Sequence, residues 1–227
     1  MTSTDSRGTR NVLMRDEVRR TAVEVFAQRG LEGATLQNVA DALGTSRTAI
    51  YRYFPNRDAL IIEVVRESAR RSADIIASSR TPDRSLVEQL DDVVTGLVRF
   101  AITRPNEIQL LNSAGPDLPD EARKISREYN RSFYAGLKAL IQEGVEAGVF
   151  QPVDPGVAAH VLAGAARTVT MWFDSSGALD AETAAAQMAA IVTRGLIRPD
   201  ASASADVRRS VDAIRAELDA LDSALGE

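Results

Sequence analysis

The chain has 227 residues, of which 44% are hydrophobic and 26% are charged, so it is long enough to bury a sizeable core and has the composition of a globular protein. It contains no cysteine and a single histidine, which excludes disulfides, thiolate catalysis and metal sites built from cysteine or histidine clusters. The net charge of −5 conceals an asymmetry, because residues 1–71 hold 12 arginines against 9 acidic residues (+3), whereas residues 72–227 hold 15 basic against 23 acidic residues (−8).

Residues 1–10 are mostly small and polar, and we expect a disordered arm from which Arg7 and Arg10 can reach a DNA backbone or minor groove. They lack the charged-then-apolar pattern of a signal peptide, and no apolar run in the chain has membrane-spanning length. We therefore expect a cytoplasmic protein that does not enter the membrane.

The apolar spacing becomes helical at about Asn11, and this first helix is predicted to end at Gly30, where a left-handed residue is favoured. Thr35 is a suitable N-cap for a short second helix that ends at Gly44. The two helices bring an apolar stripe from each to a common core, which predicts a small domain over residues 11–58.

A third helix is predicted to begin after a cap at Thr45 or Ser46 and to run to about Tyr53. A long fourth helix begins after the cap Asn56 and runs to about Ser78. Because it is amphipathic at its start and polar further on, this fourth helix can connect a small N-terminal domain to a larger one.

The second and third helices, with a tight turn between them, have the pattern of a helix-turn-helix, whose third helix lays its N-terminal residues in the major groove of DNA. There Arg47 can make a bidentate contact with guanine, and Thr48 can offer a hydroxyl or methyl group to a base edge. Tyr51 and Tyr53 carry hydroxyls suited to phosphate oxygens, and Thr35 adds a donor at a helix start. The alternative is a three-helix core that binds nothing.

Residues 59–198 form a second, larger helical domain in this interpretation, with no strand alternation. Proline and glycine separate five predicted helices, near 86–103, 106–114, 119–147, 155–174 and 181–198. Residues 199–227 combine a linker with an amphipathic helix in which apolar residues follow a heptad spacing, at Val207, Val211, Ile214, Leu218, Leu221 and Leu225. The predicted fold is all-α.

The apolar residues of the larger domain are mostly leucine, isoleucine, valine and alanine, with few aromatic residues, which favours an apolar or amphipathic small molecule as its ligand. We expect His160, with no acidic neighbour in the sequence, to serve packing or an interface rather than catalysis. Some polar and aromatic side chains are candidates for a ligand pocket, although each could instead occupy a core or a solvated helix face: Gln109, Asn112, Arg131, Tyr134 and Trp172.

Residues 33–60, GATLQNVADALGTSRTAIYRYFPNRDAL, resemble the DNA-binding signature of the tetracycline-repressor (TetR) family. The segment from Ile50 to Phe54, followed by Asn56, Arg57 and Leu60, is similar to that family's IYxYFxxKxxL element, with arginine where lysine is usual. The resemblance covers about residues 11–65, and the remaining residues match only in helix number and spacing.

This resemblance implies a homodimer that binds a palindromic operator in double-stranded DNA, most often as a ligand-responsive repressor. Carried over to this sequence, it assigns base contacts to Gln37, Arg47, Thr48 and Ala49. It assigns phosphate contacts to Thr35, Ser46, Tyr51, Tyr53 and Arg57. It also implies a dimer interface made by the helices near 155–174 and 181–198, whose many small residues permit close helix packing.

Two alternatives remain open at the level of sequence. One is an all-α lipid-binding protein or enzyme with an incidental three-helix domain, although no paired-carboxylate or phosphate-loop pattern supports catalysis, so we expect no catalytic residues, no cofactor and no metal. The other is a DNA-binding regulator that has no ligand-sensing role. Operator release on addition of a metabolite extract would exclude the latter.

Overall fold

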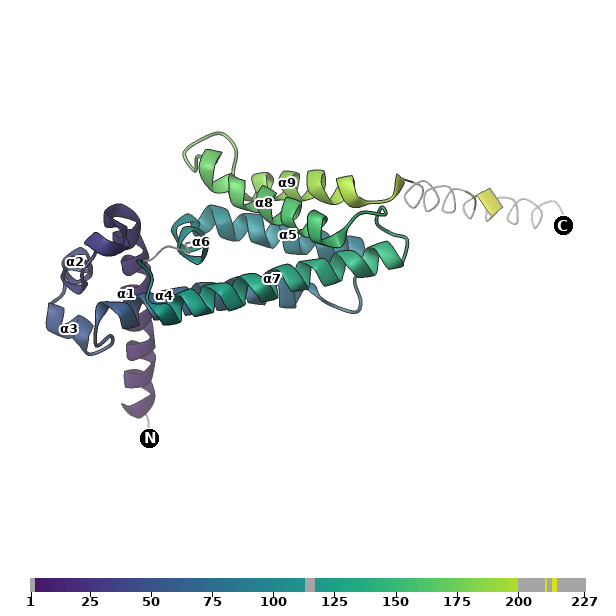
Figure 1. Cartoon of the computed structure of the whole chain (residues 1–227). Coiled ribbons are helices and arrows are strands. Elements are labelled where there is room, and N and C mark those ends of the chain that lie inside the picture. Colours follow the sequence, from purple (N-terminus) through teal and green to yellow (C-terminus); the bar gives the residue numbers. More distant parts are fainter. Residues whose placement is uncertain (1–2, 113–116, 200–210, 212–213, 216–227) are drawn as a thin grey trace, which may run out of the picture.

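The computed structural model describes residues 3–112, 117–199, 211 and 214–215, and the regular structure within these ranges is helical (Figure 1). A single isolated antiparallel bridge joins Phe150 to Ile197. The helices are α1 (Ser3–Gly33), α2 (Leu36–Ala42), α3 (Arg47–Tyr51), α4 (Arg57–Ser79), α5 (Leu86–Thr103), α6 (Pro105–Asn112), α7 (Asp120–Glu146), α8 (Pro155–Trp172) and α9 (Ala181–Leu196). The predicted all-α fold is confirmed.

The N-terminal helix differs most from its prediction. It begins at Ser3, so that residues 3–10, expected to be a disordered arm, are helical. This segment contains no proline, so nothing in its sequence interrupts a helix. The C-terminal end of α3 also differs from its prediction, since this helix stops at Tyr51 rather than near Tyr53. The predicted C-terminal heptad helix lies almost entirely outside the described residues.

Three side-chain caps fix where α2, α3 and α4 begin. The side chains of Thr35, Ser46 and Asn56 each accept a hydrogen bond from the backbone N–H three residues on, at the starts of α2, α3 and α4. Gly30 and Gly44 adopt φ values of 72° and 63°, left-handed conformations that glycine adopts without strain. The kink in α1 at Gly30 and the turn between α2 and α3 therefore follow from local sequence.

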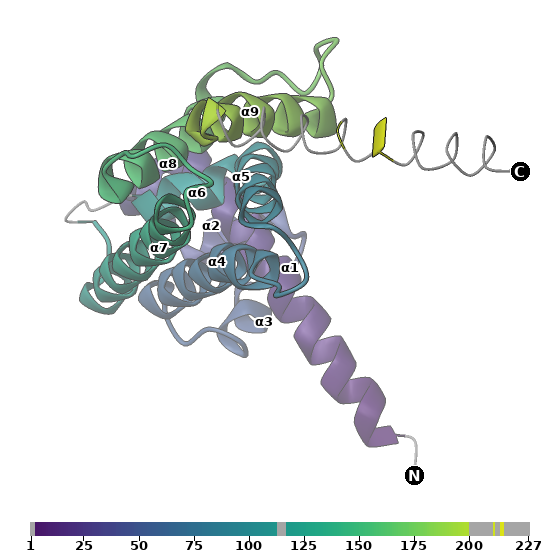
Figure 2. The same cartoon turned by 90° about the vertical axis from the view of Figure 1, so that its right-hand side faces the viewer.

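We call α1–α3 with the first turns of α4 the head, and the rest of α4 with α5–α9 the body. In the body, α5 packs against α4, α8 and α9, and α7 packs against α4 and α8. Figure 2 shows these helices nearly end-on, with α9 on the outer side of α5. Among the described helices, none combines the length and the apolarity needed to cross a membrane.

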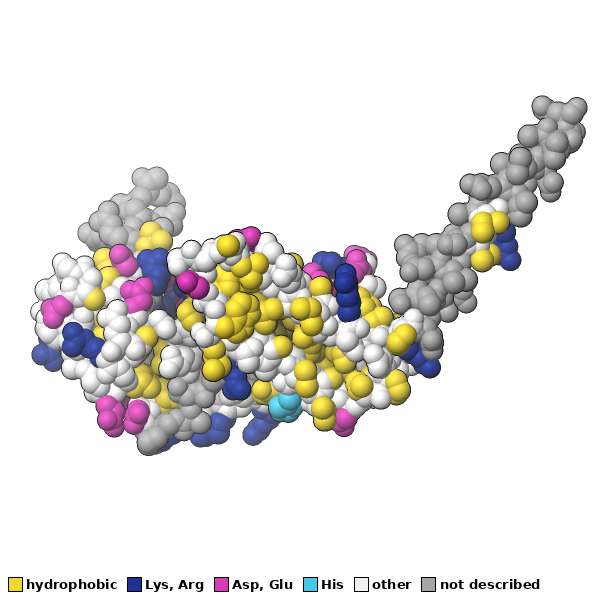
Figure 3. All heavy atoms as spheres, turned by 90° about the horizontal axis from the view of Figure 1, so that it is seen from above, with side chains coloured by type: hydrophobic (Ala, Val, Ile, Leu, Met, Phe, Trp, Pro, Cys, Tyr) yellow, Lys and Arg dark blue, Asp and Glu magenta, His cyan; other side chains and the backbone are white. Residues whose placement is uncertain are grey.

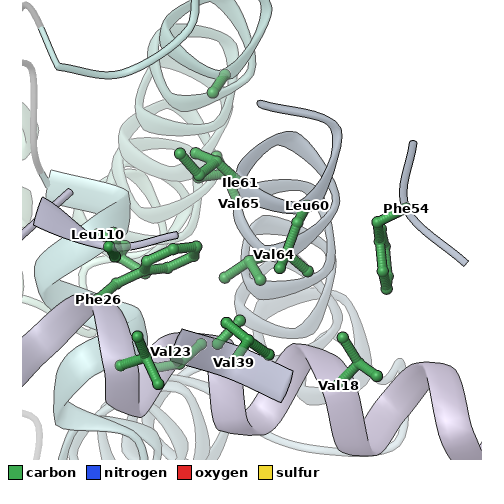
Figure 4. Close-up of a cluster of buried hydrophobic side chains, with 14 of the residues drawn as sticks. Val18, Val23, Phe26, Val39, Phe54, Leu60, Ile61, Val64, Val65 and Leu110 are labelled. Carbon is green, nitrogen blue, oxygen red and sulfur yellow. The ribbon is translucent and has the colours of Figure 1, made fainter. Parts of the chain in front are cut away.

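The core of the head continues into the body. Figure 4 shows apolar side chains of α1, α2 and α4 meeting there, with the buried Phe54 ring at one side and Phe26 beside Leu110 of α6. Because α4 contributes Leu60, Ile61 and Val64 to this core, the head is attached rigidly to the helix that also packs in the body. A displacement of α4 must therefore move the head.

Candidate nucleic-acid interface

Helix α3 exposes one face and buries the other. Ile50 is buried in the head core, whereas Arg47, Thr48 and Tyr51 are exposed. Ala49 is half-buried, so only its outer side is available to a base. The Oγ of Ser46 accepts a hydrogen bond from the Ala49 backbone N–H at 3.2 Å, which fixes the N-terminal end of the helix. The structure thus brings the predicted residues of α3 to one exposed surface.

Arg47 is pre-oriented by its neighbour one turn away. Its Nη2 donates to the Tyr51 hydroxyl at 2.7 Å, and its guanidinium carbon lies 5.1 Å from the centre of the Tyr51 ring. Arginine has five N–H donors, so several remain for a base or a phosphate while this bond persists. The pair of side chains places hydrogen-bond donors on the exposed face of α3.

Helix α2 presents Gln37 beside α3. Gln37 is exposed, and its amide Nε2 donates to the Asp41 carboxylate at 2.6 Å. Thr35 forms a capping box with Asn38, donating its hydroxyl to the Asn38 side chain at 2.9 Å. Both side chains are therefore ordered, and their predicted DNA contacts stay predictions.

Tyr53 and Arg57 have partners inside the head. Tyr53 is half-buried against the head core. The Arg57 guanidinium donates to the Leu31 carbonyl and lies 3.5 Å from the Asp58 carboxylate. Arg57 thus ties the start of α4 to the end of α1, a role that the sequence motif did not indicate, and its predicted phosphate contact remains a prediction. Arg52, exposed at the C-cap of α3, is an additional cation that we did not predict.

A group of ion pairs joins α1 to α4 beyond the head core. Glu67 receives hydrogen bonds from Arg70 and Arg71 and lies 3.9 Å from Arg19, which also pairs with Glu63. Hydrogen bonding by Arg70, and then by Arg71, lowers the pKa of Glu67 from 4.5 to about 2 although burial raises it. This carboxylate is ionised whenever the protein is folded at ordinary pH.

Acid should weaken this junction. Because the folded pKa of Glu67 lies below its unfolded value, its stabilisation is complete above about pH 4.5 and is lost as the pH falls toward 2. We expect Glu67→Gln to lower the free energy of unfolding at neutral pH by about 1–3 kcal/mol and to flatten its decline below pH 4.5. Denaturant titrations over this range measure both effects, and parallel curves for the two proteins would contradict them.

A cavity of about 160 Å³ lies in the body among α4, α5, α6, α7 and α8. Its wall contains a run of ring contacts, in which Tyr129 and Phe133 centres are 5.6 Å apart, Phe133 and Tyr134 5.3 Å apart, and Tyr134 and His160 4.3 Å apart. Further lining residues include Leu97, Ala101, Ile108, Asn130, Ala166 and Arg167.

The residues predicted to line a ligand pocket lie in different places. Tyr134 lines this cavity, and Gln109 lines a neighbouring one of about 600 Å³ between α6 and α8. Arg131 and Trp172 are exposed and line neither, because they lie on outward faces of α7 and α8. The side chain of Asn112 lies outside the described residues. The aromatic spacing at 129, 133 and 134 on one helix was the signal in the sequence that could have located the cavity.

Two buried serines of α4 connect it to the elements around the cavity. The Ser72 hydroxyl lies 2.6 Å from the Tyr129 hydroxyl, whose pKa burial raises to about 12, so this phenol stays neutral. One turn earlier, Ser68 donates to the buried Glu107 carboxylate of α6 at 2.9 Å. Through these two bonds α4 is sensitive to the positions of α6 and α7.

The outer surface of α8 and α9 is apolar. Figure 3 shows hydrophobic side chains spread over this face. Met171 is 85% exposed and Ile191 72% exposed, values expected of residues that are covered by another molecule. Other large apolar side chains exposed on α8 are Val157, Val161 and Trp172.

A helix-turn-helix head that presents α3, joined through one long helix to a helical body with a cavity, is typical of DNA-binding regulators with a separate regulatory domain. Comparison with known families specifies the class. Residues 18–64 match the model described as bacterial regulatory proteins of the tetR family, and residues 83–196 match that of the tetracyclin repressor-like C-terminal domain. The chain belongs to the TetR family of transcriptional regulators.

Relatives and solved structures agree with this assignment. The transcriptional repressor KstR2 of Rhodococcus jostii is 25% identical over 193 residues, which cover 82% of this chain and 92% of KstR2. The transcriptional regulator YfiR of Bacillus subtilis is 29% identical over 143 residues, covering 61% and 69% of the two chains. The structure of KstR2 of Mycobacterium tuberculosis has a TM-score of 0.72 at 18% identity, covering 82% of this chain and 95% of that one. AibR, solved with isovaleryl coenzyme A and operator DNA, has a TM-score of 0.67 at 21% identity, covering 81% and 97%.

Proposed function

We propose that this regulator is a homodimeric repressor that binds a palindromic operator and releases it when a small molecule occupies the body cavity. The exposed N-terminal end of α3, with Arg47 and Thr48 directed to solvent and Ile50 anchored in the core, carries the proposal. KstR2 is named a transcriptional repressor, which supports a repressing role for this chain. The AibR complex supports the proposal that a protein of this fold binds both an operator and a small molecule. We expect this activity in the cytoplasm.

The apolar face of α8 and α9 supports dimerisation. Two copies related by a two-fold axis would cover the exposed Val161 and Ile191 of both chains and would form a four-helix contact. Such a dimer holds two heads in inverted orientation, so each would meet one half-site of an inverted repeat. The palindromic operator thus follows from the symmetry of the dimer.

The position of α4 supports regulation by a ligand. Tyr129 and Ile108 line the cavity, and the bonds from Tyr129 to Ser72 and from Glu107 to Ser68 link their helices to α4. A ligand that separates these elements would shift α4 and the head core attached to it. It changes operator affinity only if it binds the released state more tightly than the DNA-bound state.

Base contacts are proposed for Gln37, Arg47, Thr48 and Ala49, and phosphate contacts for Thr35, Ser46, Tyr51, Tyr53 and Arg57. The mutation Arg47→Ala tests the base contacts. We expect it to cost about 1–3 kcal/mol per half-site and to relax the base preference at one position of each. Binding to scrambled DNA should change far less, because phosphates dominate non-specific binding.

The measurement compares operator and scrambled duplexes at one salt concentration, with Arg131→Ala on the exposed face of α7 as the matched arginine control. Equal loss of affinity for both duplexes would remove Arg47 from the base-reading role. Loss of operator binding by the control would show that body arginines, rather than α3, determine specificity.

A further inference from the structure

Arg167 of α8 lies at the boundary of two adjoining cavities. The inner cavity of about 160 Å³ lies among α4–α8, and the outer one, of about 600 Å³, is a groove open to solvent between α6 and the C-terminal part of α8, where Arg167 is exposed. Both are lined by Ile108 and Arg167. A molecule longer than the inner cavity would therefore pass beside the Arg167 guanidinium.

The inner cavity has an apolar and aromatic wall. Leu97, Phe133 and Ala166 supply apolar surface, and the Tyr134 and His160 rings stack at 15° to form a flat side. The His160 Nδ1 donates to the Gly156 carbonyl at 2.7 Å, because a carbonyl oxygen only accepts. This bond fixes the ring and leaves Nε2 available for a second partner. The wall suits an acyl chain or an aryl ring.

Among the described residues that line the two cavities, Arg167 is the only arginine, lysine, aspartate or glutamate. Among the described residues, no aspartate or glutamate lines either cavity, and no carboxylate lies within ion-pair distance of Arg167. The body is acidic overall, and many of its other arginines are paired, such as Arg80 with Glu143 and Arg99 with Glu182. An unpaired guanidinium beside an apolar cavity favours an anionic partner.

We infer that the effector is an amphipathic carboxylate, with its apolar or aryl part in the inner cavity and its carboxylate on Arg167. This inference rests on the proposed function, since it takes the cavity as the effector site. Arg167 thereby distinguishes acids from neutral molecules of the same shape, because a neutral molecule would displace water from its guanidinium without supplying an anionic partner.

Calorimetric titration of the full chain with octanoate, decanoate and 4-phenylbutyrate, each compared with the corresponding alcohol, tests this. We expect at least one acid to bind, and to bind tenfold or more tightly than its alcohol. Arg167→Met keeps the apolar stem and should lower acid affinity roughly 10- to 100-fold, to the level of the alcohol. Arg131→Met, which removes an exposed arginine that lines neither cavity, should bind the acid with the same affinity as the unchanged protein.

Binding of no acid, equal binding of acids and alcohols, or an unaltered affinity in Arg167→Met would each overturn the inference. Sedimentation of Arg167→Met must show the same oligomeric state as the unchanged protein, because a change would make Arg167 an interface residue and would also overturn it. Operator binding is measured separately, without ligand. A protein that binds the acid but no operator would refute the proposed function, whereas operator binding with no acid preference would refute the ligand class alone.

Discussion

Ile191→Arg should convert the proposed dimer to a monomer and weaken operator binding by roughly 10²–10⁴-fold. Ile191 is 72% exposed on α9, within the apolar face that α9 shares with Val161 and Met171 of α8. In the dimer an arginine there would lose its hydration without a carboxylate partner, a cost of several kcal/mol in each subunit. A monomer loses the second head, and with it the high effective concentration that a linked half-site contact provides.

Sedimentation and operator titration at the same protein concentrations measure the two effects together. Ala139→Arg, at an exposed position of α7, adds the same charge away from the apolar face and should change neither. An Ile191→Arg protein that stays dimeric and binds its operator normally would show that the apolar face of α8 and α9 is not the interface.

Phe54→Ala should lower the free energy of unfolding of the head by about 3–5 kcal/mol. The Phe54 ring is 1% exposed, and Figure 4 shows it at the side of the head core with Leu60 and Val18. Arg15 of α1 lies over the ring, 5.3 Å from its centre. Removing the ring leaves a cavity between α1, α3 and α4, and because whole domains are stable by only about 5–15 kcal/mol, operator binding should be lost with the head's structure.

Tyr51→Ala is the control for this effect, since it removes an exposed ring only three residues away. It should change the free energy of unfolding by about 0.5 kcal/mol or less, as exposed substitutions usually do. Denaturant titration followed by circular dichroism measures both variants. If the two variants lost similar amounts of unfolding free energy, Phe54 would not be the residue that holds the head together.

Local signals accounted for most helix boundaries. The caps at Thr35 and Asn56 and the left-handed Gly30 depend on residues within one turn, and the structure confirms them, while of the two candidate caps Thr45 and Ser46 it shows Ser46. The predicted start of α1 was wrong, because a polar composition does not by itself prevent a helix when proline is absent. No local pattern distinguishes such a helix from a disordered arm.

Tertiary placement was the part that the sequence could not supply. Arg57 matches a family position, but its bond to the Leu31 carbonyl depends on how α1 folds back beside α4. Among the predicted pocket residues whose side chains the structure describes, Tyr134 alone lines the inner cavity, whereas His160 and Arg167 were not predicted there. Apolar spacing can indicate which face of α7 or α8 turns inward, but which residues of that face border a cavity is determined by packing against other helices.

Selection of binding sites from random double-stranded DNA by the purified protein tests the central claim most directly. The account predicts enrichment of an inverted repeat, with affinity that falls steeply as salt rises because several phosphates in each half-site release counterions. Arg47→Ala should enrich a sequence that is degenerate at one position of each half-site. Recovery of no common sequence, or equal affinity for selected and scrambled DNA at about 150 mM salt, would contradict the account.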